Sequence, residues 1–240
     1  MIKKIYVLAL FFGLLLNNTI FSQHQVVCKY LIDPELNIGY VDSCASFWLK
    51  SYDETLGGFY TNVDRQGNVI TAWGTNKNML TQSRTAYGMV RAYMLTGNEG
   101  YLSKAKAALD FMYNSAWDNV NGGWFGEVDK NGSPINPTEN KTAFNQHYAL
   151  LGILAYYEAT GDTTAFNWFT KGFTKNQEDL WDSDDSLFGY YDYSNFNWSS
   201  KNGKSFNATV DAVTTHLINA FLLTGENTYK NKLIEIADNI

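Results

Sequence analysis

The tripeptides Thr96-Gly97-Asn98, Thr160-Gly161-Asp162 and Thr224-Gly225-Glu226 place their glycines at a constant interval of 64 residues. A fixed long period indicates one supersecondary unit copied in tandem. Glycine followed by aromatic residues keeps nearly the same interval, in Gly57-Gly58-Phe59-Tyr60, Gly122-Gly123-Trp124-Phe125 and Phe188-Gly189-Tyr190. A third marker behaves in the same way, in Asn76-Lys77, Asn140-Lys141 and, near the next expected place, Gly203-Lys204. The fold is therefore expected to consist of repeated units of 64 residues.

Each repeat predicts two helices joined by the Thr-Gly turn. In the first repeat, apolar and small side chains recur at helical spacing over residues 81–95 and again over 99–115. The turn glycine suits the left-handed residue that ends the first helix, and the polar residue after it suits the cap of the second. The later helices are expected at 143–159, 163–180, 207–223 and 228–240, and one more between Asp33 and Ser51 belongs to a preceding, incomplete unit.

The first helix of each pair is more apolar than the second, which carries lysines, so the first set is expected inside and the second outside. Such hairpins stack into an open solenoid or, when they curve, into a closed α/α toroid. The loops between repeats are long, and residues 124–129 with Asn131-Gly132 predict short β-hairpins. The expected class is all-α.

Long loops in a compact domain are usually functional. These loops are expected to gather at one end of the inner helices and to wall a cup with their aromatic residues: Tyr60, Trp124, Phe125, Tyr190, Tyr191 and Trp198. An aromatic, weakly charged cup suits a sugar, whose C–H faces stack on rings. The alternative is that these rings pack the loops against the helices below.

The first 23 residues predict a secretory signal peptide, because Lys3 and Lys4 precede an apolar run from Ile5 to Leu16. The run is too short to cross a bilayer core, which needs about 20 residues, although a membrane anchor remains the alternative. Residues 24–240 then form the exported, partial repeat domain, without a membrane span after signal cleavage. We expect a periplasmic or extracellular protein.

Composition and charge limit the classes of partner that this protein is expected to bind. The chain of 240 residues is 45% hydrophobic and 16% aromatic with a formal net charge of −6, which fits a compact globular body and no nucleic-acid partner. Its two cysteines, Cys28 and Cys44, leave open either one disulfide or two free, buried thiols. Oligomeric state is left open by the sequence.

Superposing the repeats on the 64-residue interval puts Arg84, Tyr148 and Ala212 in one row at the start of the inner helices. One turn deeper lie two glycines and His216, so the row is expected to leave space for a sugar. We predict His216 as the proton-transfer group beside the reacting carbon and Arg84 as the group that stabilises an oxyanion. The alternative is that the glycines let the helices pack closely and His216 bonds a neighbouring helix.

Three stretches carry a family resemblance: Gln82-Ser83-Arg84-Thr85-Ala86-Tyr87, Lys141-Thr142-Ala143-Phe144-Asn145-Gln146-His147-Tyr148-Ala149-Leu150 and Thr215-His216-Leu217-Ile218-Asn219-Ala220-Phe221. Together with the Thr-Gly turns they resemble the N-terminal portion of the N-acylglucosamine 2-epimerase and cellobiose 2-epimerase family. The resemblance implies an (α/α)6 toroid that interconverts sugars at C2, or aldoses with ketoses, through an ene-diol(ate). It implies no metal and no other cofactor.

The resemblance also suggests roles for individual residues. Arg84 matches the arginine that binds the sugar oxygen, and His216 matches the histidine of the third inner helix. The candidates for substrate binding are Tyr148, Gln146, His147, Trp124, Tyr60 and Tyr190. Two departures stand out, because Ala212 replaces an asparagine of the family and the acid/base histidines of the family belong to later inner helices. About three and a half of six repeats are present.

Three functions therefore remain open. The first is a sugar 2-epimerase or aldose–ketose isomerase. The second is a glycoside hydrolase on a six-hairpin toroid, which needs paired acids, with these candidates: Asp184 and Asp185, Glu127 and Asp129, and Asp211. The third is a non-catalytic carbohydrate-binding half-toroid.

Overall fold

A computed structural model describes residues 28–182, 184 and 188–239. The predicted signal peptide, residues 1–23, lies outside the described residues. The chain divides into two compact units, residues 1–37 and 38–240. In the first unit the short helix α2 (Lys29–Ile32) is described, and the second unit holds the repeats.

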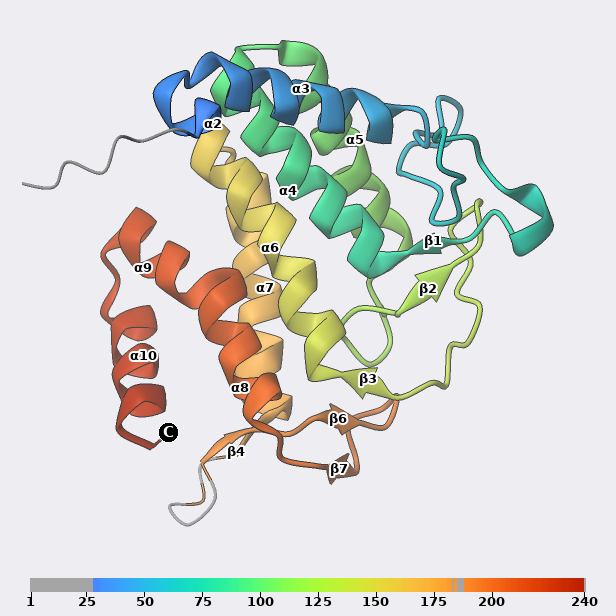
Figure 1. Cartoon of the computed structure of the whole chain (residues 1–240). Coiled ribbons are helices and arrows are strands. Elements are labelled where there is room, and N and C mark those ends of the chain that lie inside the picture. The colour runs from blue at the N-terminus through green and yellow to red at the C-terminus, as the bar shows by residue number, and fades with distance from the viewer. Residues whose placement is uncertain (1–27, 183, 185–187, 240) are drawn as a thin grey trace, which may run out of the picture. The chain divides into compact units, whose positions relative to one another are not determined.

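The helices of the second unit confirm the predicted repeat. After α3 (Glu35–Leu49), which begins in the first unit, come α4 (Met79–Thr96) with α5 (Glu99–Ser115) and α6 (Ala143–Thr160) with α7 (Thr163–Asp179). The third inner helix is built of α8 (Phe206–Ala212), the π-helical turn η2 (Val213–Leu217) and α9 (Ile218–Thr224), and α10 (Asn227–Asn239) follows it. Figure 1 shows α4, α6 and α8 side by side, with α5 and α7 behind them. The predicted inner and outer sets are therefore confirmed.

The Thr-Gly turns end the inner helices as expected. Gly97, Gly161 and Gly225 have φ of 71°, 69° and 70°, the left-handed conformation that glycine adopts without steric cost. The side chains of Asn98 and Asp162 then cap α5 and α7 by accepting hydrogen bonds from backbone amides of the first turn. Local chemistry thus fixes both helix ends at the first two turns, and the end of the inner helix at the third.

The strands are short and join consecutive repeats. β1 (Lys77–Asn78), just before α4, pairs with β2 (Glu127–Val128) of the next loop, and β3 (Lys141–Thr142) pairs with β6 (Tyr193–Ser194) of the loop after that. β6 also pairs with β7 (Lys201–Asn202), and β4 (Trp181–Asp182) pairs with β5 (Gly189–Tyr190). The predicted hairpin at residues 124–129 is therefore mainly a pairing between repeats, closed locally by a single bridge from Val128 to Pro134.

Two remaining expectations concern the membrane and the cysteines. Among the described residues, no helix combines the length and the apolar character that a membrane crossing requires. Cys28 and Cys44 are both free, exposed thiols. The structure therefore contains no bond between the two cysteines, and the expectation that free thiols would be buried is wrong, because both are exposed.

Candidate functional site

A buried ion pair lies under each of the first two loop turns. Lys77 Nζ lies 2.8 Å from Asp53 Oδ2, with side chains 0% and 5% exposed, and Lys141 Nζ lies 2.6 Å from Asp118 Oδ2, with 2% and 4% exposed. Each lysine also donates to a glycine carbonyl of the turn, Gly57 or Gly122. Burial raises the pKa of the Asp118 carboxyl, but the hydrogen bonds from Lys141 and Asn121 outweigh it and bring that pKa to about 2.

A side-chain clamp fixes the aromatic residue that follows each turn. Gln146 Oε1 accepts a hydrogen bond from the Trp124 amide and Gln146 Nε2 donates to the Trp124 carbonyl, at 2.8 and 2.9 Å. In the third repeat Thr209 Oγ1 accepts from the Tyr190 amide at 3.0 Å. Trp124 and Tyr190 are buried in the hydrophobic core. Trp124 therefore packs its loop onto the helices instead of lining the predicted cup, whereas Tyr190, although buried, borders a pocket.

The other aromatic candidates are placed differently. Tyr60 is half-buried, and its hydroxyl donates to Asp53 Oδ2 at 2.8 Å. Tyr148 is half-buried on the face of the inner helices that carries Arg84. The substrate-binding role of Tyr148 stays a prediction, as do those of Tyr60, Trp124, Tyr190, Gln146 and His147.

The third inner helix contains one residue more than the first two. Lys77 precedes Gly97 by 20 residues and Lys141 precedes Gly161 by 20, whereas Lys204 precedes Gly225 by 21. The π-helical turn Val213–Leu217 lies within this stretch. A π-turn adds one residue to an α-helix without ending it, and such turns are frequent at functional sites. The extra residue therefore shifts the register of the third inner helix.

The shift changes the predicted row. Counting from Lys204 rather than from the glycine turn, the equivalent of Arg84 and Tyr148 is Asp211 instead of Ala212. The structure agrees, since Ala212 is fully buried while Asp211 feels the charge of Arg84. The misplaced Lys204 was the signal in the sequence that could have located Asp211. We call Arg84, Phe144, Tyr148 and Asp211 the inner-helix row.

Arg84 and the two aromatic residues of the row are in contact. The Arg84 guanidinium carbon lies 4.2 Å from the centre of the Tyr148 ring and 5.6 Å from that of Phe144, and the two rings are 4.7 Å apart. A cation over an aromatic face is held by the ring quadrupole. Burial raises the pKa of the Asp211 carboxyl, and the positive charge of Arg84 lowers it in part. The row thus combines a cation, two rings and a carboxylate.

Two hollows border the row. Arg84 lines one of about 520 Å³ together with Tyr40, Trp48 and Gly88. Asp211 lines one of about 470 Å³ with Phe144, Asp192 and Asn207. Both volumes lie in the range of about 300–1,000 Å³ that is usual for small-molecule sites. The row can therefore offer a sugar both a ring face and charged hydrogen-bonding groups.

His216 lies away from Arg84. Its ring is buried, with Nε2 3.2 Å from His147 Nδ1, and the rings of Phe169 and Phe173 pack around it. Asn176 Nδ2 also approaches His147 Nδ1, at 3.4 Å. The two histidine rings and the Asn176 amide therefore form one buried polar cluster.

The seam between inner helices explains this placement. Gly152, the equivalent of His216 one repeat earlier, faces Ser83, and a Cβ there would collide with the Ser83 carbonyl. Ser83 in turn is the equivalent of His147. Gly152 therefore lets α4 and α6 pack closely, which corrects the prediction that its missing side chain opens space for a sugar. His147 and His216 occupy the same seam between α6 and η2.

Burial dominates the protonation of this histidine pair. It lowers the pKa of His147 to about 3, against a weaker raising effect from the backbone of Ala208. Burial and the neighbouring His147 lower the pKa of His216 well below its usual value. Both rings are therefore neutral near pH 7. The catalytic roles of His216 and Arg84 stay predictions, with Arg84 exposed on the row and His216 enclosed behind it.

The acidic residues weighed for a hydrolase have different surroundings. Asp129 accepts backbone hydrogen bonds from Asn131 and Ser133 and so shapes a turn. Burial raises the pKa of Glu127. Asp184 is exposed, and Asp185 lies outside the described residues. Over residues 28–182, 184 and 188–239, no three histidine, cysteine, aspartate or glutamate side chains gather as a metal site would require.

Comparison with known proteins adds two kinds of similarity. The family model described as N-acylglucosamine 2-epimerase matches residues 58–240. A cellobiose 2-epimerase from Eubacterium cellulosolvens is 32% identical over 143 residues, covering 60% of this chain and 32% of that protein. One from Ruminococcus albus is 27% identical over 193 residues, covering 75% of this chain and 46% of that protein. The chain thus spans less than half the length of these relatives.

A solved structure shows the fold. The structure of a cellobiose 2-epimerase from Bacillus thermoamylovorans superposes with a TM-score of 0.74 at 18% identity, covering 85% of this chain and 55% of that one. The fold is thus of the (α/α)6-toroid type, of which this chain provides about half, as the family resemblance implied.

Proposed function

Because the chain belongs to the N-acylglucosamine 2-epimerase family, we propose that it acts on carbohydrates as a sugar 2-epimerase or an aldose–ketose isomerase. The reaction transfers the C2 proton to a base, passes through an ene-diol(ate) and returns the proton to C2 or to C1; the family resemblance assigns this acid/base role to histidines of later inner helices. The observation that carries the proposal in this chain is the inner-helix row, in which Arg84 stacks on Tyr148 and faces Asp211.

The row provides what the intermediate requires. Negative charge develops on a sugar oxygen when the C2 proton leaves, and a preorganised cation lowers the energy of that state. The Arg84 guanidinium is exposed on the row and held by the ring of Tyr148. We assign Arg84 to the oxyanion and the Tyr148 and Phe144 rings to the C–H face of the sugar. Asp211, a pure acceptor when ionised, suits the sugar hydroxyls.

The histidine pair supports the row from behind. His216 and His147 are neutral, buried and bonded to each other, and they fix η2 against α6. Asp211 precedes η2 by two residues, so the seam sets how far Asp211 lies from Arg84. In this proposal His216 positions the row. The sequence-based prediction that His216 meets the reacting carbon is the competing assignment.

Deuterium exchange tests the reaction directly. The 240-residue protein is incubated in deuterated water with mannose, glucose, N-acetylmannosamine or cellobiose, and NMR follows the signal of the C2 proton. We expect loss of that signal, and product formation, with at least one sugar. A folded full-length form that exchanges no C2 proton with any of the four sugars would refute the isomerase proposal.

Variants separate the roles of Arg84 and His216. Arg84→Ala is expected to reduce exchange by about 100-fold or more with an unchanged helical CD spectrum, as for the loss of one oxyanion donor. Arg84→Lys restores the charge without the planar stack and should recover part of the rate. His216→Gln should lower thermal stability and leave the pH profile of exchange unchanged. A shifted pH profile would instead identify His216 as the proton-transfer group.

We also propose that the protein works outside the cytoplasm. Support comes from Lys3 and Lys4 followed by the apolar run to Leu16. Expression of the whole chain in a bacterium should yield an exported protein that begins near Gln23 or His24, as mass spectrometry of the secreted fraction would show. Recovery of the unprocessed chain only from the cytoplasm would refute this proposal.

A further inference from the structure

The lysine of each buried ion pair in the first two repeats lies between two aromatic rings. Lys77 Nζ is 5.3 Å from the ring centre of Tyr60 and 4.3 Å from that of Phe111. Lys141 Nζ is 5.6 Å from the ring of Phe125 and 5.1 Å from that of Trp198. Tyr60 and Phe125 are equivalent residues of their loops. Phe111 and Trp198 are not equivalent, yet each supplies a ring over the glycine turn and its lysine.

Trp198 supplies this ring from an unusual backbone position. Its φ is 65°, and it is the one non-glycine residue with positive φ among the described residues. The equivalent residues of the first two loops are glycines, Gly67 and Gly132, with φ of 86° and 94°. In all three loops this residue donates its amide to a carbonyl three residues back, at 3.0 to 3.1 Å. A bulky side chain here is strained, and such strain persists where the surroundings hold it.

The surroundings of Trp198 form a fitted seat. Its indole Nε1 donates to the carbonyls of Asn121 and Gly122, at 3.0 and 3.2 Å. The ring covers Gly123 so closely that a Cβ there would collide with it. Lys175 Nζ lies 5.2 Å from the ring on another side. The seat thus combines a glycine turn, carbonyl acceptors and the cation of the ion pair.

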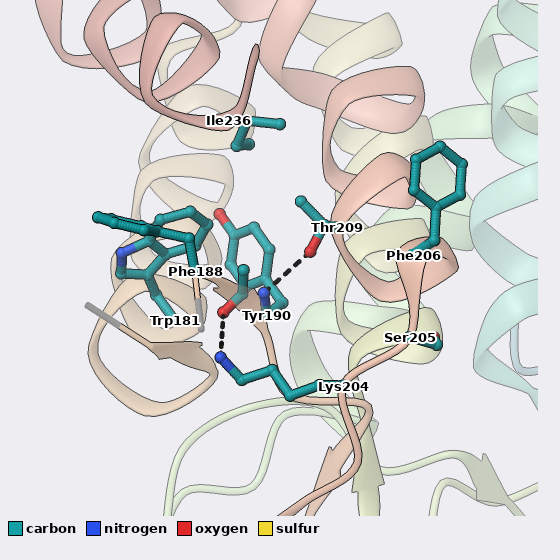
Figure 2. A pocket seen from close by; sticks show the side chains of 9 residues that line it. Trp181, Phe188, Tyr190, Lys204, Ser205, Phe206, Thr209 and Ile236 are labelled. Carbon is teal, nitrogen blue, oxygen red and sulfur yellow. Dashed lines mark hydrogen bonds between the residues drawn. The ribbon is translucent and has the colours of Figure 1, made fainter. Parts of the chain in front are cut away.

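In the third repeat, the residues equivalent to those of this seat line a pocket. The equivalents of Gly122, Gly123, Lys141 and Gln146 are Phe188, Gly189, Lys204 and Thr209. All four line a pocket of about 240 Å³, together with Trp181, Tyr190, Ser205, Phe206 and Ile236. Figure 2 shows Lys204 on one side of this pocket, with Thr209 across it and Ile236 of α10 at the far end. Thr209 Oγ1 lies so close to Gly189 that a Cβ there would collide with it, so the pocket opens beside this glycine and not directly over it.

We propose that this pocket, which we call the third-repeat seat, binds the indole ring of a tryptophan carried on a hairpin loop, as the second repeat holds Trp198. The ring would lie beside Gly189 and Thr209 with its face toward Lys204 and its N–H toward the Phe188 carbonyl. A volume of 240 Å³ lies below the range of drug-sized sites and suits one bicyclic ring. The proposal does not depend on the isomerase reaction.

Methyl NMR of the whole chain tests the seat. The probe is a cyclised peptide with the sequence of residues 193–202, which carries Trp198 on its own turn, and N-acetyltryptophanamide is the small-molecule probe. We expect the peptide to shift the methyl signals of Thr209 and Ile236, with a dissociation constant of about 1 mM or tighter. The matched peptide with Trp198→Ala should cause no shift.

A variant supplies the control for the pocket itself. Ile236→Trp fills the seat from α10 and should abolish the shift of the Thr209 methyl while CD shows a folded protein.

If this variant does not fold, the seat that Trp198 occupies in the second repeat offers another test. Trp198→Ala empties that seat, so millimolar indole should raise its melting temperature. Indole should leave the Trp73→Ala protein unchanged, because Trp73 is 70% exposed and occupies no such seat.

The outcomes are decisive. Absence of any shift with both probes overturns the proposal. Shifts with N-acetyltryptophanamide but not with the peptide show a small-molecule aromatic site and overturn the assignment to a loop. Shifts that persist in Ile236→Trp place the ring elsewhere and also refute it.

Discussion

The second and third repeats both contain a lysine–aspartate ion pair and a side-chain clamp, but the two repeats differ in how far the ion pair is buried and how many backbone groups the clamp holds. In the second, Lys141 and Asp118 are almost fully buried and Gln146 holds both backbone groups of Trp124. In the third, Lys204 and Asp182 are 23% and 15% exposed, and Thr209 holds only the amide of Tyr190. The ion pair and the clamp therefore form one structural module. Its contribution to the stability of the fold depends on how far neighbouring residues bury it.

The largest expected effect comes from breaking the ion pairs one at a time. Lys141→Met leaves Asp118 charged in a buried site, and we expect a loss of about 3–5 kcal/mol in the free energy of unfolding. Lys204→Met should cost about 1 kcal/mol or less, because water reaches its pair. Urea denaturation measures both. Equal losses in the two variants would contradict the comparison.

The next largest difference in stability is expected between the side-chain clamps of the second and third repeats. Gln146→Ala leaves the amide and the carbonyl of Trp124 buried without their partner, for which we expect a loss of about 2–4 kcal/mol. Thr209→Ala removes a single hydrogen bond and should cost about 1 kcal/mol. The same denaturation series applies, with the exposed Thr214→Ala as a control. A larger loss for Thr209→Ala than for Gln146→Ala would show that the third clamp is the stronger one.

The two helix seams should differ in pH dependence. His147 has a pKa of about 3 in the folded protein and about 6.5 when unfolded. A lowered folded pKa means that the unfolded chain binds more protons, so stability is complete above pH 6.5 and falls as the pH drops toward 3. Between pH 7 and pH 5 His147 alone should cost about 2 kcal/mol. Melting temperatures across this range measure the loss.

A matched variant isolates that effect. The double variant His147→Ser, His216→Gly installs the residues of the first seam, Ser83 and Gly152, in the second. Its absolute stability will change, but its stability should no longer vary with pH between 5 and 7. If the slope persists in the double variant, other groups titrate and the histidine seam is not the cause.

The smallest effect is expected from removing the extra residue of the third inner helix. Deletion of Thr214, which is exposed on η2, restores the spacing of the first two repeats and should convert the π-turn to α-helix. We expect a change in stability of about 1 kcal/mol or less. Backbone NOE patterns would show the conversion. Retention of the π pattern after the deletion would show that the seam, not the residue count, imposes it.

The sequence predicted the elements well because their signals are local. Gly97, Gly161 and Gly225 mark helix ends through a backbone conformation that needs no distant partner. The apolar periodicity of residues 99–115 likewise predicts α5 over Glu99–Ser115. Arg84 and Tyr148 were placed in one row from the repeat interval alone, and the structure brings them into contact.

Prediction of the candidate site failed where the answer depended on a neighbouring repeat. Trp124 was expected in a cup, but the clamp from Gln146 turns its loop into the core. Gly152 was expected to open space, but the backbone of α4 fills it. Ala212 was expected in the row, but the extra residue of η2 puts Asp211 there.

The sequence by itself determined the repeat, the helix boundaries and the family, since these follow from caps, periodicity and motifs within a few tens of residues. Only the tertiary structure decided which side chains face outward and which lie in the seams. The physical reason is that facing depends on contacts between residues far apart in the sequence, from Gln146 with Trp124 in the same repeat to His147 with His216 and Trp198 with Gly122 across repeats. A shift of one residue, as in η2, then changes the face while leaving the helical pattern intact.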